Sequence, residues 1–376
     1  MQKKTKYHTF FRALTMIALQ LFIILPIHSE AKGVLPEFEN GQISPSTKSG
    51  TRAIWMYQFP ELDNKETIKE LLDMGINLVF LSTDSSRLLP SGTNASRAYT
   101  QKMRDFINRS HNAGISVHAM TLEDTGFTFS KYHARGAQLV EWIIDFSADS
   151  ETLEPFDGVH IDTEPHALPS WSDAMANQDW AGMEKTMQQY VQLLATIHDT
   201  LRTSPVTLPL SPAIHWKYSE WAADGKVPSA DPEILGRYVD FLVPMVYEIT
   251  GSAKIHSRSL GEATKVPTLV GISAIDFSGY ESLKDSIAAL GERFKDEDKY
   301  MGTSVFKFST LKALYKANMS LVEDDSESNL PPTDPVEEIV DEAEENESDL
   351  VCKRVINSKR NKEKRRVRRR NARRSK

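Results

Sequence analysis

Short apolar runs alternate with amphipathic segments along residues 52–314 of the chain. Eight runs are rich in β-branched and aromatic residues, which is typical of strands. Between them, segments such as 64–75, 100–114 and 183–202 carry apolar residues at helical spacing. The eight runs are RAIWMY (52–57), NLVFLS (77–82), ISVHAM (115–120), DGVHID (157–162), VTLPLSPAI (206–214), VDFLVPMVY (239–247), TLVGISA (268–274) and GTSVFKF (302–308).

This rhythm predicts an α/β fold. Eight strand–helix units in about 260 residues match the size and order of a (β/α)8 TIM barrel. A doubly wound sheet is the alternative, but no glycine-rich phosphate-binding turn follows the first strand, as that fold would favour.

Charge is strongly segregated along the 376 residues, although the net charge is only −7. Residues 351–376 carry fourteen Lys and Arg against one acid, and residues 323–350 carry thirteen acids and no base. The body, 32–322, has a net charge of −10, which argues against nucleic-acid binding at the barrel. We expect both tail segments to be disordered, since neither can bury a core. The basic segment is suited to an anionic cell-surface polymer, although a nucleic-acid arm and a tail without function are alternatives.

The first residues are typical of a secretory signal. A basic stretch, 1–12, precedes an apolar stretch, 13–27, and the small residues Ser29 and Ala31 then offer a cleavage site. The apolar stretch is shorter than the ~20 residues of a membrane-spanning helix, which favours cleavage over an uncleaved anchor. We therefore expect a protein that is secreted or held in the cell envelope. The only cysteine is Cys352, so export does not imply a disulfide.

These observations divide the chain into five parts. We predict a signal peptide (1–31), a linker (32–50), a barrel (51–322), an acidic disordered segment (323–350) and a basic disordered tail (351–376). We expect a monomer that needs no cofactor and no metal.

The stretch FDGVHIDTEPH (156–166) concentrates titratable groups. Val159 and Ile161 alternate with His160, Asp162 and Glu164, as in a strand with one apolar and one polar face. Residues at the C-terminal ends of barrel strands form the active site of TIM-barrel enzymes. Two carboxyl groups on one strand face repel each other, so one pKa should rise until that group holds a proton near neutral pH.

Other predicted strands end in residues typical of sugar-binding sites. Indole faces stack on sugar rings while carboxylates bind hydroxyl groups, so this inventory indicates glycoside chemistry. The candidate substrate-binding residues are Trp55, Tyr57, His118, Trp171, His215, Trp216, Glu248 and Phe306. Trp171 and Trp216 follow strand ends, which favours the rim for both, whereas His118 and His215 fit core and rim equally well.

Three motifs resemble the family-eighteen glycoside hydrolases, which include chitinases and endo-β-N-acetylglucosaminidases. DGVHIDTE (157–164) is similar to their strand-four signature D-G-x-D-x-D-x-E, and MVYE (245–248) to their strand-six M-x-Y-D. TLVGISA (268–274) resembles their seventh strand. The resemblance implies an exported hydrolase of β-glycosidic bonds in glycans that contain N-acetylglucosamine.

The resemblance also implies catalytic roles. Glu164 would be the general acid, while Asp162 and Tyr247 would hold the substrate's N-acetyl group, whose carbonyl oxygen attacks the anomeric carbon. Three positions depart from the family pattern. His160 replaces an Asp and can donate to Asp162, Glu248 replaces an Asp, and Phe306 replaces the Trp under the reacting sugar.

Other functions remain open from the residues alone. A two-carboxylate glycosidase would pair Glu164 with Glu248 or Asp276, and a barrel without turnover would be a carbohydrate-binding lectin. His160, Asp162, Glu164 and His166 are a weaker candidate for a metal site, because His166 follows a proline and leaves the strand.

Overall fold

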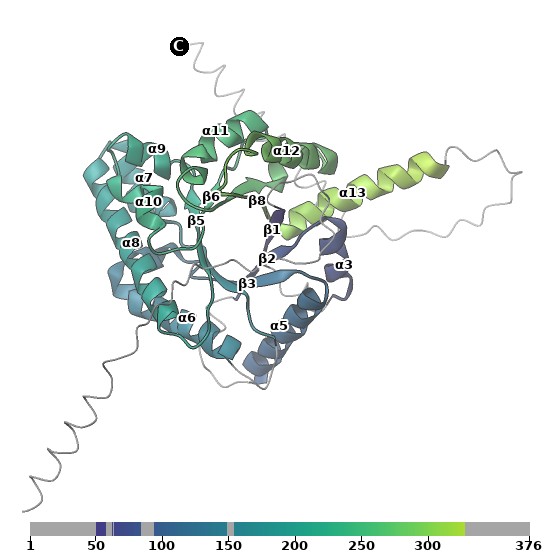
Figure 1. The fold of residues 1–376 in the computed structure, drawn as a ribbon, viewed down its shortest axis with the longest axis horizontal. Helices are drawn as coiled ribbons and strands as arrows, with labels where there is room; N and C mark the ends of the chain where they lie inside the picture. The colour runs from purple at the N-terminus through teal and green to yellow at the C-terminus, as the bar shows by residue number, and fades with distance from the viewer. Residues whose placement is uncertain (1–49, 58–61, 63, 84–93, 149–153, 328–376) are drawn as a thin grey trace, which may run out of the picture. The chain divides into compact units, whose positions relative to one another are not determined.

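The computed structural model describes residues 50–57, 62, 64–83, 94–148 and 154–327. Eight parallel strands pair in chain order, and β8 pairs back with β1 to close a barrel (Figure 1). The predicted (β/α)8 barrel is confirmed, and the doubly wound sheet is excluded because no strand edge is open. The strands are β1 (Thr51–Met56), β2 (Leu78–Ser82), β3 (Ser116–Thr121), β4 (Gly158–Ile161), β5 (Leu210–His215), β6 (Val243–Met245), β7 (Thr268–Ser273) and β8 (Tyr300–Phe306).

The strands β5 and β6 are much shorter than the sequence predicts. β5 begins at Leu210, after Pro209, which has no N–H to donate to a neighbouring strand. Ahead of it, the side-chain hydroxyl of Ser204 bonds to Val206 and turns the chain. β6 contains Pro244, which likewise has no N–H to donate to a neighbouring strand. Its pairing with β7 is limited to Met245 with Gly271, and an isolated bridge joins Leu242 and Thr268.

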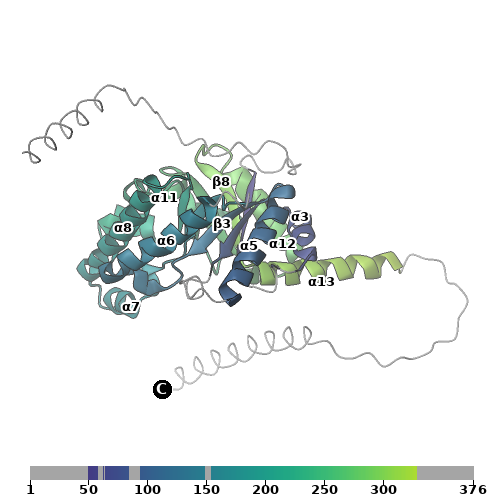
Figure 2. The ribbon, with the colours of Figure 1, turned by 90° about the horizontal axis from the view of Figure 1, so that it is seen from below.

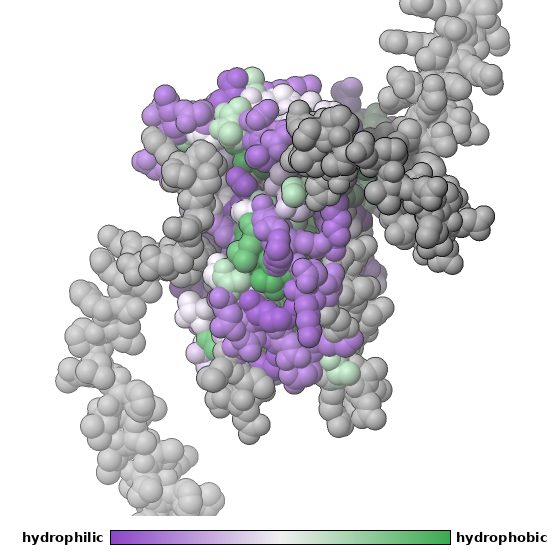
Figure 3. Space-filling view, turned by 90° about the vertical axis from the view of Figure 1, so that its right-hand side faces the viewer, coloured by the Kyte–Doolittle hydropathy of each residue, from purple (hydrophilic) through white to green (hydrophobic). Residues whose placement is uncertain are grey.

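Helices surround the barrel (Figures 1 and 2). Among the coloured residues in Figure 3, hydrophilic side chains predominate and a strip of apolar ones lies near the middle, as expected for amphipathic helices over a buried sheet. Within the described residues, no helix is long and apolar enough to cross a membrane. The α-helices are α3 (Glu66–Asp73), α5 (Asn94–Asn112), α6 (His133–Ala148), α7 (Pro169–Ala176), α8 (Trp180–Arg202), α9 (Tyr218–Ala223), α10 (Pro232–Leu235), α11 (Ser252–Ala263), α12 (Tyr280–Arg293) and α13 (Phe308–Glu327).

Helix α8 shows how the sequence sets these elements. Its N-cap Asp179 accepts a hydrogen bond from the Gly182 N–H at 3.0 Å, which satisfies one free donor of the first turn. Its buried side chains recur every three or four residues and pack on the barrel. These side chains are Met183, Met187, Tyr190, Leu193, Leu194, Ile197 and Leu201.

The two faces of β4 divide as its alternation predicts. Val159 and Ile161 belong to the apolar layer between strands and helices, whereas His160 is fully buried inside the barrel. The interior is filled by large rings, and glycines make room for them. A Cβ added at Gly158 would lie 2.6 Å from the His118 ring, closer than real Cβ contacts allow.

The predicted boundaries at the chain ends are mostly outside the described residues. The signal peptide, almost the whole linker, and the tails beyond Glu327 lie there. Helix α13 runs to Glu327, past residue 322, where the sequence places the end of the barrel.

Candidate active site

Polar side chains gather at the C-terminal ends of the strands. Three of the described non-glycine residues have positive φ, and Leu122 after β3 and Glu248 after β6 are two of them. Backbone held in this sparsely populated region is typical of functional sites. The rim set comprises Tyr57, Ser82, Glu123, Asp162, Glu164, Tyr247, Glu248 and Asp276.

Asp162 lies at the centre of this rim and is 9% exposed. The Tyr57 hydroxyl donates to its Oδ2 at 2.8 Å, and within the described residues Oδ1 accepts no hydrogen bond. Burial, followed by the charges of Glu164 and Glu123, raises the pKa of Asp162 to about 7, against the opposing effect of the Tyr57 hydrogen bond. Of the two strand-four carboxyl groups, Asp162 is therefore the one whose pKa is raised toward neutrality.

Glu164 follows β4 and keeps 31% of its side chain exposed. Its Oε2 lies 3.1 Å from Nε2 of His166, which is in the 3-10 turn η3 (Pro165–Ala167). The other ring nitrogen of His166, Nδ1, is buried and has no hydrogen-bond partner in the described structure. Glu164 is thus open to a substrate on one side and held by an imidazole on the other.

The Tyr247 hydroxyl lies near Asp162 and Glu164. Its Oη is buried and has no hydrogen-bond partner among the described residues. Burial, then the charges of Asp162, Glu164 and Asp276, raise the pKa of Tyr247 well above its usual value, so the phenol keeps its proton. A buried donor that faces carboxylates and is left unpaired costs roughly 1–3 kcal/mol, which a bound acceptor would recover.

Phe306 is the last residue of β8 and lies close to these groups. Its ring centroid is 5.3 Å from Tyr247, 5.9 Å from Tyr57 and 6.1 Å from Trp55. Phe306 therefore packs between the rim tyrosines and the interior ring of Trp55.

His160 does not donate to Asp162, which corrects the expectation from sequence. Its Nε2 accepts from the Trp55 indole N–H at 3.2 Å, and its Nδ1 lies 2.9 Å from the Ser211 hydroxyl. The ring also stacks on Phe80 at 3.9 Å, and burial lowers its pKa well below the usual value. His160 is therefore a neutral interior residue with both nitrogens used.

Asp276 and Glu248, the two alternative carboxylate partners of Glu164, have different surroundings. Asp276, at the end of the 3-10 turn η5 (Ala274–Asp276), accepts the backbone N–H of Glu248 at 2.6 Å. This bond supports the left-handed backbone of Glu248, whose φ is 61°. Asp276 thus has a structural task at the rim, while the Glu248 residue is exposed.

Three candidate sugar-binding residues are buried rather than at the rim. Trp55 is 1% exposed, because its indole lies inside the barrel and is hydrogen-bonded to His160. His118 is buried deeper in the same interior, against Phe80 and Gly158. Trp171 is 1% exposed because α7 turns it into the outer apolar layer.

The last two candidates, His215 at the end of β5 and Trp216 just after it, are half-buried. The His215 ring lies 4.6 Å from the His166 ring, and it stacks on Trp216 at 5.6 Å and on Trp221 at 5.4 Å. The Arg258 guanidinium lies 3.3 Å from the centre of the Trp216 ring. That face of Trp216 is therefore covered by Arg258 and not free for a sugar.

Sequence reasoning missed Glu123 and Ser82. The Ser82 hydroxyl donates to Glu123 Oε1 at 2.5 Å, and Glu123 contributes to the raised pKa of Asp162. Both residues follow the rule that barrel strands end in active-site residues, so their positions at the ends of β2 and β3 were a usable signal.

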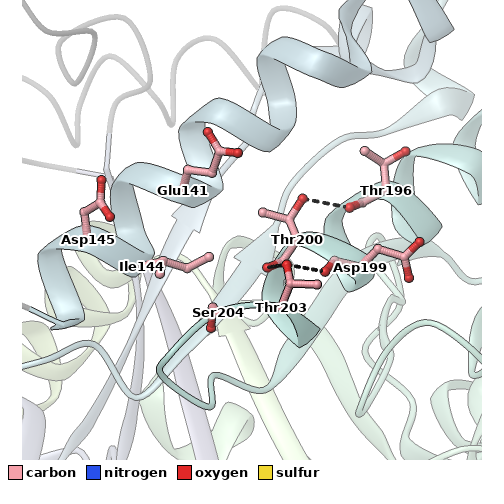
Figure 4. A pocket seen from close by; sticks show the side chains of 8 residues that line it. All are labelled: Glu141, Ile144, Asp145, Thr196, Asp199, Thr200, Thr203 and Ser204. Atoms are coloured by element: carbon pink, nitrogen blue, oxygen red, sulfur yellow. Dashed lines mark hydrogen bonds between the residues drawn. The ribbon is translucent and has the colours of Figure 1, made fainter. Parts of the chain in front are cut away.

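A separate hollow of about 550 Å³ lies between α6 and α8 (Figure 4). Its threonine hydroxyls donate to carbonyl groups of their own helix, and it lies on the C-terminal halves of both helices. The C-terminal halves of α6 and α8 lead into the starts of β4 and β5, so the hollow lies toward the end of the barrel opposite the rim. Its lining residues are Glu141, Ile144, Asp145, Thr196, Asp199, Thr200, Thr203 and Ser204.

Within the described residues, no three histidine, cysteine or acidic side chains gather as metal ligands. The candidate metal set of strand four is divided, because both nitrogens of His160 bond to Trp55 and Ser211.

Comparisons with known proteins find fold similarity alone. No family model matches the chain, and no curated protein matches it. A chitinase from Chromobacterium violaceum ATCC 12472 is 13% identical, with a TM-score of 0.45, over 72% of this chain and 99% of that one. The spore cortex-lytic enzyme SleL of Bacillus cereus is 13% identical, with a TM-score of 0.46, over 72% and 75%.

A further similar structure is the exo-β-1,4-mannosidase Op5Man5 from Opitutaceae bacterium strain TAV5. It is 11% identical, with a TM-score of 0.47, over 75% of this chain and 61% of that one. By their descriptions, these three proteins are a chitinase, a spore cortex-lytic enzyme and a mannosidase. At such identities and scores the likeness carries no argument about the present chain's chemistry, which depends on its own side chains.

Proposed function

We propose that the protein is an exported glycoside hydrolase that cleaves β-glycosidic bonds next to a 2-acetamido sugar. Glu164 acts as the general acid, and Asp162 and Tyr247 hold the acetamido group. One observation carries the proposal. A buried carboxyl with a pKa near neutrality and a buried, unpaired phenol face the same rim as an accessible glutamate.

These groups complement an acetamide. The Tyr247 hydroxyl is a donor in need of an acceptor and fits the acetamide carbonyl oxygen. Asp162 Oδ1 fits the acetamide N–H, since Tyr57 occupies only Oδ2. Held in this way, the carbonyl oxygen attacks the anomeric carbon while Glu164 gives its proton to the leaving oxygen. Water then opens the cyclic oxazolinium and returns a proton to Glu164.

Two features of the surroundings suit this reaction. Ionised Asp162 would stabilise the positive charge that develops on the acetamide nitrogen, and its burial strengthens that interaction. The Phe306 ring offers an apolar surface beneath the reacting sugar. The pairing of Glu164 with Asp276 is less favoured, because the Asp276 carboxylate already holds the Glu248 backbone.

Location and assembly belong to the same proposal. Residues 1–31 direct export and are removed, 32–50 link the mature end to the barrel, and the basic tail contacts an anionic surface polymer. The mature protein is a monomer. N-terminal sequencing of secreted protein tests the cleavage, with a mature end at Lys32 expected.

The chemistry is tested with a matched pair of substrates, 4-methylumbelliferyl chitobioside and the cellobioside, which has a hydroxyl in place of the acetamide. We expect turnover of the chitobioside only. Glu164→Gln should lower kcat roughly 10²–10⁴-fold because it removes the proton. The control is Glu292→Gln on the exposed surface of α12, which should keep wild-type activity.

Each of the other possible results leads to a different conclusion. Full activity of Glu164→Gln on the chitobioside would refute the assignment of the acid. Equal turnover of the cellobioside would show a two-carboxylate glycosidase, because that substrate cannot assist its own cleavage. Binding of chitin oligosaccharides without any turnover would show a lectin.

A further inference from the structure

Two cations lie near the Trp216 ring, which follows β5, and neither has an acidic partner among the described residues. The Arg258 guanidinium, from α11, lies 3.3 Å from the centre of the Trp216 ring, and Lys217 Nζ lies 5.1 Å from it. Among the described residues, neither cation forms an ion pair, and Arg258 Nη1 is buried without a hydrogen-bond partner. We call Trp216, Lys217 and Arg258 the cationic platform.

The cationic platform is unusual for this chain. The body has a net charge of −10, so carboxylates are abundant, yet none lies within 4.0 Å of these two cations in the described structure. A buried guanidinium N–H without an acceptor costs free energy that a bound oxyanion would recover. The neighbouring His215 ring is affected by these positive charges. Burial, then the charges of His166, Lys217 and Arg258, lower the pKa of His215 to about 3.

The cationic platform is close to the proposed acid. Glu164 Oε2 lies 3.1 Å from His166, and the His166 ring lies 4.6 Å from the His215 ring, which stacks on Trp216. A continuous row of side chains therefore connects Glu164 to Trp216 along the rim. A glycan that places one bond at Glu164 can place a neighbouring sugar over the platform.

We propose that the cationic platform is a subsite for a negatively charged sugar, so that the substrate is an acidic glycan. Arg258 binds the carboxylate or sulfate oxygens of the sugar, Lys217 adds charge, and Trp216 is a positioning residue that holds the guanidinium plane. This inference rests on the proposed function for the reaction, but binding tests it separately. It also revises the expected role of Trp216, whose ring face supports Arg258.

Binding by the full-length protein to three tetrasaccharides of similar size tests the subsite. Chitotetraose is neutral, a hyaluronan tetrasaccharide carries carboxylates, and a keratan sulfate tetrasaccharide carries sulfates. Titration calorimetry gives the ratio of affinity for each acidic glycan to that for chitotetraose. In Arg258→Met, which keeps length and contact with Trp216, this ratio should fall roughly 10-fold or more, the range of a charge-assisted hydrogen bond.

Two variants separate the charge from its geometry. Arg258→Lys keeps the charge but not the planar fork, so its ratio should lie between those of wild type and Arg258→Met. Arg202→Met makes the same change of charge on the exposed end of α8, before β5 begins, and should leave the ratio unchanged. The preference of the wild type should weaken between 50 and 500 mM salt, because ions screen the charges.

The outcomes are distinct. A lower ratio with hyaluronan or with keratan sulfate supports the subsite and identifies carboxylate or sulfate as its ligand. An equal ratio in wild type and Arg258→Met with both acidic glycans overturns it, even if chitobioside is hydrolysed. An Arg258-dependent preference without hydrolysis of any glycan would keep the subsite and refute the proposed reaction instead.

Discussion

Replacing Asp162 by Asn should make the protein more stable at alkaline pH while impairing its reaction. Asp162 is nearly buried, and its pKa rises from 3.8 to about 7 in the folded protein. Above pH 7 the carboxyl is ionised in both states, and the folded state carries the whole cost of burying the charge. That rise corresponds to an upper value of about 4 kcal/mol, since each pKa unit is worth about 1.4 kcal/mol.

The direction of this pH dependence follows from proton binding by Asp162. The folded state holds this proton more tightly than the unfolded state, so protonation removes the cost as pH falls from 7 toward 4. Asn has the same shape, carries no charge and still accepts from Tyr57. Its NH₂ group offsets part of the gain, so we expect about 2–3 kcal/mol at pH 8 and close to zero at pH 4. A barrel of this size would melt roughly 5–10 °C higher at pH 8.

Urea unfolding followed by tryptophan fluorescence at pH 4, 6 and 8 measures this difference. Asp298→Asn, in the exposed turn before β8, is the matched control and should change stability little at any of these pH values. A stabilisation of Asp162→Asn that is the same at pH 4 and pH 8, or absent at pH 8, would refute the reasoning. It would mean that burial does not disfavour the charge at this position.

Two further predictions concern titrating groups. Tyr57→Phe removes the hydrogen bond that lowers the pKa of Asp162, so that pKa should rise further. The acidic limb of kcat/KM against pH should then move to higher pH, and an unmoved limb would show that ionised Asp162 is not required. At the other end of the barrel, His111 bonds to Asp157 and Glu154 at 2.9 Å, and the bond to Asp157 most strongly raises its pKa. Stability from this pair is complete below pH 6.5 and is lost as pH rises through the raised value, so His111→Gln should cost more stability at pH 6 than at pH 9. Urea unfolding at both pH values measures the costs, and equal costs would contradict the charged bridge.

Much of the fold was predictable because it depends on local pattern. The eight apolar runs and the amphipathic segments between them repeat in order, and parallel strands joined by helices close only in a few ways. The strand-four alternation also predicted which side chains face inward, since the period of two is a property of the strand itself. The shortened β5 and β6 departed from prediction where Pro209 and Pro244 remove backbone donors.

The candidate site was predictable in kind but not in detail. The sequence places Asp162, Glu164 and Tyr247 at the C-terminal ends of strands. In the structure, the charge of Glu164 helps to raise the pKa of both Asp162 and Tyr247. Trp55 and Trp171 were expected at the rim, and both are buried. Spacing along the chain tells which face a side chain occupies, but not how deep it lies along the barrel axis.

The sequence by itself determined the number and order of the strands, the two faces of β4 and the segregation of charge, because periodicity and composition are local. Only the tertiary structure decided that Asp162 is the carboxyl with the raised pKa and that Tyr57 is its partner. It likewise decided that Arg258 covers Trp216, 42 positions earlier in the chain. Burial and pairing arise from contacts between distant segments, and those contacts exist only once the barrel has closed.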